Sequence, residues 1–130
     1  MNHKACNMQH ETREKFHKIL KQKLDDFAYN VYKNSKEFPK EEMYGITSQL
    51  RRAALSVVLN YIEGYARLSD NQLRYFLQMS YGSLKETKYL LYFSEREGYL
   101  KKDNYKKLIN LAEEIGAMLW TTIKGIKEKA

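Results

Sequence analysis

The sequence predicts an all-α fold, an up-down-up-down antiparallel four-helix bundle, and three observations support it. One proline and six glycines occur among 130 residues, so turns are few and the segments between them are long. Apolar residues recur at i, i+3 and i+4 spacing in four of these segments, which is the period of an amphipathic helix. The connections between the segments are short, and short connections make consecutive helices antiparallel neighbours.

The first helix is expected from about Gln9 to Lys36, and its two faces differ in polarity. Its inward face follows the helical spacing and holds Phe16, Ile19, Leu20, Leu24, Phe27 and Val31. Lysines dominate the opposite face, which we expect to face water. The helix ends at Phe38-Pro39, because a residue that precedes proline avoids the helical region. We expect residues 1–9 to form a flexible tail and residues 10–130 to form a single domain.

The second helix begins between Pro39 and Thr47, runs to about Leu68, and is apolar on two sides. One apolar face holds Ile46, Leu50, Ala53, Ala54, Val57, Tyr61 and Gly64. The opposite side holds Leu55, Val58, Leu59 and Ile62. A narrow polar stripe between the two faces contains Arg52, Asn60, Glu63 and Arg67. Glu63 and Arg67 are spaced for an i, i+4 ion pair, and Asn60 and Arg52 are candidates for hydrogen bonds across helices. The alternative interpretation of the stripe is a plain solvent-exposed seam.

The third and fourth helices have recognisable boundaries. The segment from Ser69 to Gln72 reads as a capping box, so the third helix starts there, and it ends before Gly98. Its inward stripe is Leu73, Leu77, Ser80, Leu84, Thr87 and Leu91. The fourth helix is expected from about Lys102 to Lys127, with Leu108, Ile109, Ala112, Ile115, Leu119, Ile123 and Ile126 inward.

A second apolar surface on the second and third helices predicts an oligomer. A four-helix monomer buries one stripe on each helix, so the additional apolar side chains need another surface to cover them. Each fully buried Leu, Ile or Phe side chain contributes roughly 1.5–3 kcal/mol, so several of them can hold subunits together. The predicted interface residues are Leu55, Val58, Leu59, Ile62, Tyr75, Met79, Leu90 and Phe93.

The net charge of +7 is concentrated in the first and last quarters of the chain. Residues 1–36 carry eight basic and four acidic side chains, and residues 101–130 carry seven and four. In an antiparallel bundle the end of the first helix lies beside the start of the fourth, and their other ends also meet. We therefore expect two basic clusters that bind nucleic-acid phosphates, Lys33, Lys36, Lys101, Lys102, Lys106 and Lys107 at one end and Lys15, Lys18, Lys124 and Lys127 at the other. The alternative is a solvated lysine surface that keeps the protein soluble.

Several linked motifs give the chain a family resemblance. They are FPKEE at residues 38–42, YGITSQLRRAA at residues 44–54, EGY at residues 63–65, GSLKE at residues 82–86 and GYL at residues 98–100. Over nearly all of the chain after about residue 12, the sequence resembles the small four-helix bundle proteins encoded by intervening sequences inside bacterial 23S ribosomal RNA genes. The resemblance implies a homopentameric barrel. Related proteins, the accessory variability proteins of diversity-generating retroelements, use such a barrel with a basic surface to bind nucleic acid and a reverse transcriptase.

The chain departs from this family at the start of the fourth helix. Members commonly begin that helix with Ser and acidic residues, whereas this chain has Leu100-Lys101-Lys102-Asp103. Such a start lacks a good N-cap and puts positive charge at the positive end of the helix dipole. Since the arrangement is locally unfavourable, anion binding is one explanation for the lysines.

The sequence contains none of the common enzyme signatures, GxxxxGK, GxSxG or HExxH. His3, Cys6 and His10 have a spacing that one helix could present to a metal, but incidental residues in a tail are the better interpretation. We therefore predict that the protein is not an enzyme and that it binds no metal and no cofactor.

The eleven tyrosines could stack on nucleic-acid bases, but their helical spacing favours packing within the protein. A single cysteine and the lack of a membrane-length apolar run predict a cytoplasmic protein that does not enter a membrane.

Two functions remain after these exclusions. The first is a non-enzymatic, homo-oligomeric four-helix bundle that binds structured RNA or DNA through its basic surface. RNA recognised by its shape is favoured, because no RRM or KH signature for reading bases is present. The second is a structural or adaptor ring that docks a protein partner such as a polymerase or reverse transcriptase.

Overall fold

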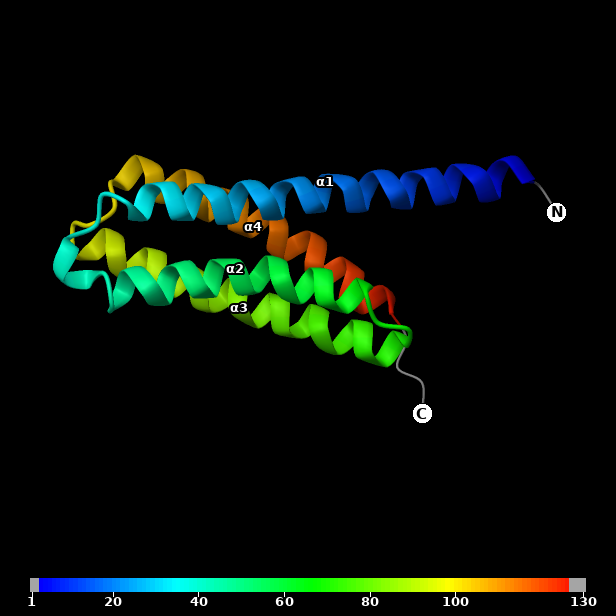
Figure 1. Cartoon of the computed structure of the whole chain (residues 1–130). Coiled ribbons are helices and arrows are strands. Elements are labelled where there is room, and N and C mark those ends of the chain that lie inside the picture. Colours follow the sequence, from blue (N-terminus) through cyan, green and yellow to red (C-terminus); the bar gives the residue numbers. More distant parts are fainter. Residues whose placement is uncertain (1–2, 127–130) are drawn as a thin grey trace.

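A computed structural model of the protein describes the backbone of residues 3–126 and the side chains of residues 9–126, and it is a bundle of four α-helices (Figure 1). The helices are α1 (His3–Ser35), α2 (Ile46–Tyr65), α3 (Asp70–Arg96) and α4 (Lys102–Gly125), with a short 3₁₀ helix, η1 (Lys40–Glu42), before α2. No strand occurs within residues 3–126. None of the four helices is long and apolar enough to cross a lipid bilayer.

The helices alternate in direction, and α2 and α3 form the most extensive pairing in the bundle. The start of α4 lies beside the end of α1, and the two helices then diverge, so that α4 ends near the start of α3 (Figure 1). At 1.5 Å per residue the 33 residues of α1 span about 50 Å, whereas the 20 residues of α2 span about 30 Å. The N-terminal part of α1 therefore projects beyond the end of α2 (Figure 1).

The helix ends follow local signals in the sequence. The Ser69 hydroxyl accepts a hydrogen bond from the Gln72 amide at 3.1 Å, which confirms the predicted start of α3. Gly98 adopts a φ of 80° two residues after α3 ends, a conformation that favours glycine. The first helix begins at His3 instead of Gln9, because residues 3–9 contain no glycine or proline that would interrupt a helix.

One apolar core runs through the bundle and matches the predicted inward faces. Its largest fully buried side chains are Leu20, Leu24, Phe27, Val31, Leu50, Val57, Tyr61, Leu77, Leu84, Leu91, Ile115 and Leu119. Ile19 was predicted to face inward, but it is 44% exposed. It lies at the edge of the α1 stripe, 100° away from Leu20, so the core does not enclose it.

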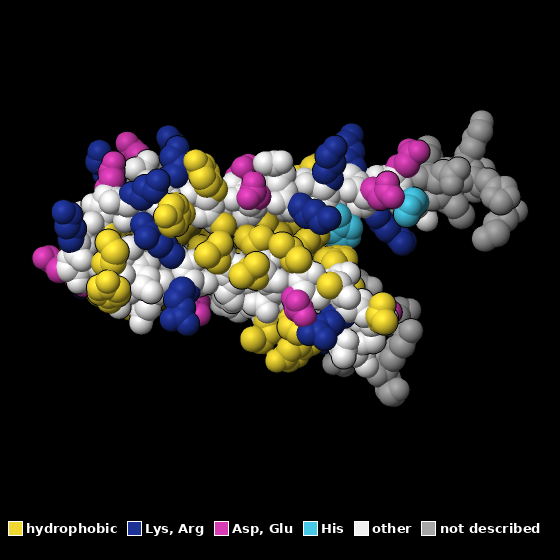
Figure 2. All heavy atoms as spheres, in the orientation of Figure 1, with side chains coloured by type: hydrophobic (Ala, Val, Ile, Leu, Met, Phe, Trp, Pro, Cys, Tyr) yellow, Lys and Arg dark blue, Asp and Glu magenta, His cyan; other side chains and the backbone are white. Residues whose placement is uncertain are grey.

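The second apolar face of α2 is on the molecular surface. Leu55, Leu59 and Ile62 are 50%, 59% and 56% exposed, and Val58 is half-buried. Hydrophobic side chains gather on this side of the bundle around α2 (Figure 2). On α3 the exposed apolar residues include Tyr75, Met79 and Phe93.

Leu90 does not belong to this second face, so its assignment to the interface is wrong. It is 9% exposed and is part of the core. Leu90 follows Ser83 by seven residues and therefore points to the same side of α3. Ser83 faces α2, because its hydroxyl lies 2.8 Å from the Ser56 hydroxyl of that helix.

Candidate nucleic-acid interface

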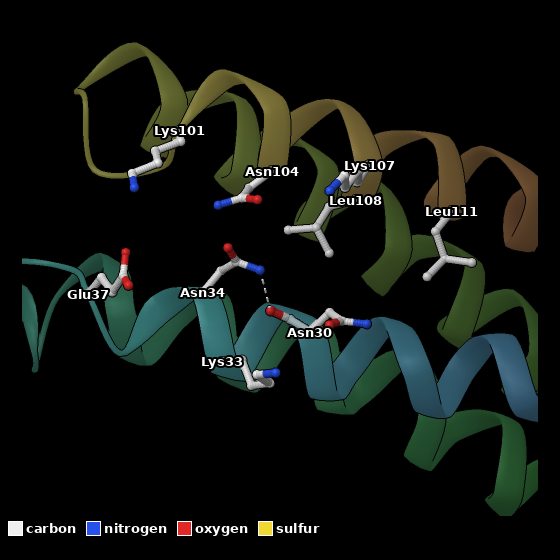
Figure 3. Close-up of a pocket in the computed structure, with 9 residues that line it drawn as sticks. All are labelled: Asn30, Lys33, Asn34, Glu37, Lys101, Asn104, Lys107, Leu108 and Leu111. Carbon is white, nitrogen blue, oxygen red and sulfur yellow. Dashed lines mark hydrogen bonds between the residues drawn. The ribbon is translucent and has the colours of Figure 1, made fainter.

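A polar groove of about 460 Å³ lies between the end of α1 and the start of α4. Its lining residues are Asn30, Lys33, Asn34, Glu37, Lys101, Asn104, Lys107, Leu108 and Leu111. Lys101 and Asn104 point from α4 toward α1, and Asn34 and Glu37 point back from the α1 side (Figure 3). Three lysines and three asparagines thus surround one groove whose single acidic residue is Glu37.

The asparagines of the groove can present polar atoms to a ligand. The Asn34 side-chain amide donates a hydrogen bond to the Asn30 backbone carbonyl at 2.8 Å (Figure 3). That bond fixes the Asn34 side chain so that its carbonyl oxygen points toward α4 (Figure 3). A fixed amide with an open acceptor suits hydrogen bonding to a sugar hydroxyl or a base edge.

The start of α4 also contributes positive character to the groove. Lys101 occupies the N-cap position, and its side chain makes no capping hydrogen bond. The amides of the first turn therefore lack a side-chain acceptor, and the helix dipole places partial positive charge there. Asp103 is the one acidic residue in this turn. An anionic ligand at this end of the helix would satisfy the amides and meet the lysines.

The groove lysines differ from Lys23 and Lys88 in forming no salt bridge with the described side chains. Lys23 of α1 forms a salt bridge with Glu114 of α4 at 2.6 Å. Lys88 of α3 pairs with Glu113 of α4, and this hydrogen bond lowers the pKa of the glutamate. Lys33 lies over the Tyr29 ring at 5.7 Å, which leaves its charge available.

The remaining predicted lysines at this end lie outside the groove. Lys36 is exposed and sits over the Tyr32 ring at 5.3 Å. Lys102 and Lys106 are exposed on α4. They add positive charge near the groove, whose lining lysines are Lys33, Lys101 and Lys107.

The second predicted lysine cluster is not assembled by the structure. Lys15 is exposed on α1, and Lys18 lines a cavity that faces α2. Lys124 lies over the Trp120 ring at 5.4 Å, and Lys127 lies outside the described residues. The two helices have diverged at this end of the bundle (Figure 1).

The polar stripe of α2 makes mostly local contacts. Arg67 and Glu63 form the expected i, i+4 ion pair at 2.5 Å, and the Arg67 guanidinium also covers the Phe76 ring at 4.8 Å. The Asn60 side chain donates to the Ser56 carbonyl and hydroxyl at 2.9 Å, so it stays within α2. Arg52 is exposed. Ser56, not Asn60 or Arg52, contributes a side chain to a hydrogen bond with α3, and the Ser80 hydroxyl of α3 also donates to the Val57 carbonyl of α2 at 2.6 Å.

A second site, which the sequence interpretation missed, lies between α1 and the end of α2. A cavity of about 520 Å³ is lined by His10, Arg13, Glu14, His17, Lys18, Lys21, Tyr61 and Tyr65. The α1 residues recur at helical spacing, and Tyr61 and Tyr65 are one turn apart on α2. Antiparallel pairing of these two stripes is the signal that could have revealed the site.

Among residues whose side chains are described, no group of three His, Cys, Asp or Glu residues could hold a metal ion. His10 instead contacts Glu14 at 2.9 Å, and the side chains of His3 and Cys6 lie outside the described set.

Comparisons with known proteins agree with the fold. A crystal structure of a protein of unknown function from the S23 ribosomal protein family of Bacteroides thetaiotaomicron superposes with a TM-score of 0.78 at 24% sequence identity. The superposition covers 84% of this chain and 98% of that chain, and at this identity it supports the fold alone. No curated protein matches the sequence. The family model for the 23S rRNA-intervening sequence protein matches residues 17–121, so the chain belongs to that family.

Proposed function

We propose that the protein is a non-enzymatic, homo-oligomeric four-helix bundle that binds structured RNA or DNA in the cytoplasm. The observation that carries this proposal is the groove between α1 and α4, which is lined by Lys33, Lys101 and Lys107, none of which forms a salt bridge with the described side chains. Lysines bind phosphates with little dependence on sequence, and the released counterions make such binding sensitive to salt.

Structured RNA is the favoured ligand for two reasons. The groove combines cations for phosphates with three asparagine amides, which can donate to and accept from a ribose 2′-hydroxyl. RNA helices are recognised mainly through phosphate and 2′-hydroxyl contacts, because side chains cannot read the bases in their deep, narrow major groove.

Assembly into a ring would multiply this basic surface. The exposed apolar side chains of Leu55, Leu59 and Ile62 on α2, with Tyr75 and Met79 on α3, form the face that we assign to contacts between copies. Copies joined through this face would repeat the α1 and α4 groove once in every subunit. Repeated grooves raise the effective concentration of binding sites along one RNA molecule.

Binding of a labelled RNA hairpin tests this proposal. The variant Lys101→Glu with Lys107→Glu is compared with a matched control, Lys40→Glu with Lys85→Glu, which makes the same change in net charge away from the groove lining. We expect the groove variant to bind at least tenfold more weakly at physiological salt and the control to bind almost normally. The slope of log affinity against log salt should fall by up to about 0.9 for each duplex phosphate that the variant no longer neutralises.

Equal weakening of hairpin binding in the two variants would mean that net charge alone drives binding. Weak binding of the unmodified protein at physiological salt would also contradict the proposal, and the search would turn to a protein partner.

A further inference from the structure

We propose that the cavity between α1 and the end of α2 binds a nucleotide, with its base on the Tyr65 ring and its phosphate among Arg13, Lys18 and Lys21. The cavity lies at the opposite end of the bundle from the α1 and α4 groove (Figure 1). The inference extends the proposed nucleic-acid binding to a second place, and it does not depend on the lysines of that groove.

The size and shape of the cavity suit a small ligand. Its volume of about 520 Å³ lies in the range of small-molecule sites, about 300–1,000 Å³. The helix α1 continues past the end of α2 (Figure 1), and His17 already contacts Tyr65, the last residue of α2. Arg13 and His10 lie one and two turns further along α1 in that direction. One wall is thus a row of α1 side chains, and the other consists of the tyrosines of α2.

The charge of this cavity favours an anion. Its lining includes three side chains that are always cationic, Arg13, Lys18 and Lys21, and one carboxylate, Glu14. Glu14 contacts His10 at 2.9 Å, whereas the three cations form no salt bridge with the described side chains. Burial, and to a smaller extent the nearby charge of Lys21, lower the pKa of His17 and so favour its neutral ring beside these cations.

The aromatic part of the cavity is held in place by its own contacts. The His17 and Tyr65 rings meet edge to face, with centroids 5.2 Å apart and planes at 69°. The Tyr61 and Tyr65 rings lie 4.9 Å apart. Tyr65 is 41% exposed, so part of its ring remains open to a planar ligand, whereas Tyr61 is 1% exposed. A fixed, half-open tyrosine beside cations is the kind of surface on which nucleic-acid bases stack.

Polar atoms at the floor of the cavity complete the site. His17 Nδ1 lies 3.1 Å from the Tyr61 hydroxyl and 3.4 Å from the Tyr65 hydroxyl. The Tyr65 hydroxyl also hydrogen-bonds the Tyr61 hydroxyl, and its longer contact with His17 can be exchanged for a hydrogen bond to a base edge or a ribose. An aromatic surface, hydroxyl groups and cations together match the base, sugar and phosphate of a nucleotide better than they match a simple inorganic anion.

A nucleotide could reach this site free in solution or as the phosphorylated end of an RNA strand. Calorimetric titration of the full chain with four probes separates these sources: AMP, adenosine, and a tetranucleotide RNA with or without a 5′-phosphate. We expect AMP to bind at least tenfold more tightly than adenosine. A free nucleotide as the natural ligand predicts equal affinity for AMP and the phosphorylated tetranucleotide, whereas a strand end predicts at least tenfold tighter binding of the tetranucleotide.

Variants of the cavity locate the binding. Lys18→Ala with Lys21→Ala should weaken AMP binding at least tenfold, and Tyr65→Leu should weaken it severalfold while keeping an apolar side chain. Lys40→Ala with Lys85→Ala, which removes two lysines away from the cavity lining, is the matched control and should bind like the unmodified protein. Circular dichroism checks that every variant remains helical.

The inference is overturned if neither AMP nor the phosphorylated tetranucleotide saturates the protein, or if both cavity variants bind them normally. If the nucleotide probes fail these tests while the hairpin RNA binds normally, only the nucleotide site is contradicted. Normal AMP binding with no effect of the Lys101 and Lys107 changes on the hairpin would contradict only the proposed function.

Discussion

At the scale of single residues, α2 and α3 approach each other closely where Gly64 faces Leu73 and Phe76. A Cβ atom at position 64 would lie 3.2 Å from Leu73 Cδ1, 3.2 Å from Phe76 Cβ and 3.3 Å from the Leu73 carbonyl oxygen. Two of these three neighbours are tied closely to the backbone, so they cannot move aside as the end of a flexible side chain would. Gly64 therefore permits the close packing of these two helices.

Replacing Gly64 with alanine tests this packing. The alanine would gain up to about 1 kcal/mol in helix propensity, but overpacking typically costs about 1–3 kcal/mol. We expect a net loss of about 1 kcal/mol in the free energy of unfolding, measured by urea denaturation. Gly82→Ala is the control, because nothing lies within 4 Å of a Cβ there, and it should raise stability by about 0.5–1 kcal/mol. A stabilised Gly64→Ala protein would show that the helices can separate slightly without loss.

His17 should make stability depend on pH. Burial, and the charge of Lys21, lower the pKa of His17 in the folded protein, so the neutral ring is favoured there. Tyr61 and Tyr65 face the same ring from α2, and burial raises the pKa of both hydroxyls, so they stay neutral at moderate pH. In the unfolded chain the pKa of His17 is about 6.5, so below that pH the unfolded chain binds a proton at His17 more readily than the folded chain does. The stability that the neutral ring contributes is present above this pH and is lost as the pH falls through the folded pKa.

The expected result is a thermal midpoint that falls between pH 7.5 and pH 5 by more in the unmodified protein than in His17→Gln. The glutamine keeps a polar side chain at this position but does not titrate. Identical pH profiles for the two proteins would show that His17 is protonated without cost to the fold.

At the scale of helices, the start of α4 combines poor local stability with positive charge. Lys101 sits at the N-cap in an extended conformation, and its side chain makes no capping hydrogen bond. Lys101→Ser supplies a capping hydroxyl in a backbone geometry that already suits it, which should raise the free energy of unfolding by about 0.5–2 kcal/mol. The same change removes one cation from the groove, so hairpin RNA should bind more weakly. Tighter RNA binding by this more stable variant would contradict a phosphate contact at Lys101.

Most of the helical architecture could be predicted because each helix has a strong periodic pattern, and the third helix also has clear end signals. The Ser69 cap and Gly98 placed the ends of α3 within two residues. The errors lie at the edges of apolar stripes, where Ile19 is exposed and Leu90 is buried. A period of 3.6 residues fixes the centre of a face, but the position of a neighbouring helix decides what its edge contacts.

The candidate sites were predicted less completely than the fold. Antiparallel order alone was enough to place Lys33 near Lys101 and Lys107. The other expected cluster failed because the sequence does not reveal that α1 and α4 diverge (Figure 1). The cavity at His17 was missed because its aromatic and basic residues form no known motif.

At the scale of the whole molecule, the groove lysines and the exposed apolar side chains of α2 belong to different helices. The unpaired groove lysines lie between α1 and α4, whereas the exposed leucine and isoleucine side chains lie on α2. An assembly through α2 would therefore leave the groove uncovered. It would also avoid placing the repelling lysine groups of neighbouring copies within one interface.

The assembly prediction can be tested by charging the apolar face. Leu55 and Ile62 are each at least half exposed, so Leu55→Asp with Ile62→Asp should leave the core intact and place two carboxylates in the proposed interface. Burying an unpaired charge is costly, so we expect the variant to be monomeric by light scattering and still helical by circular dichroism. Tyr44→Asp is the matched control, because Tyr44 is 96% exposed before α2 begins and lies outside the proposed face. If the double variant kept the assembly mass of the unmodified protein, the α2 face could not be the contact between copies, and the apolar side chains of α3 would be the next surface to charge.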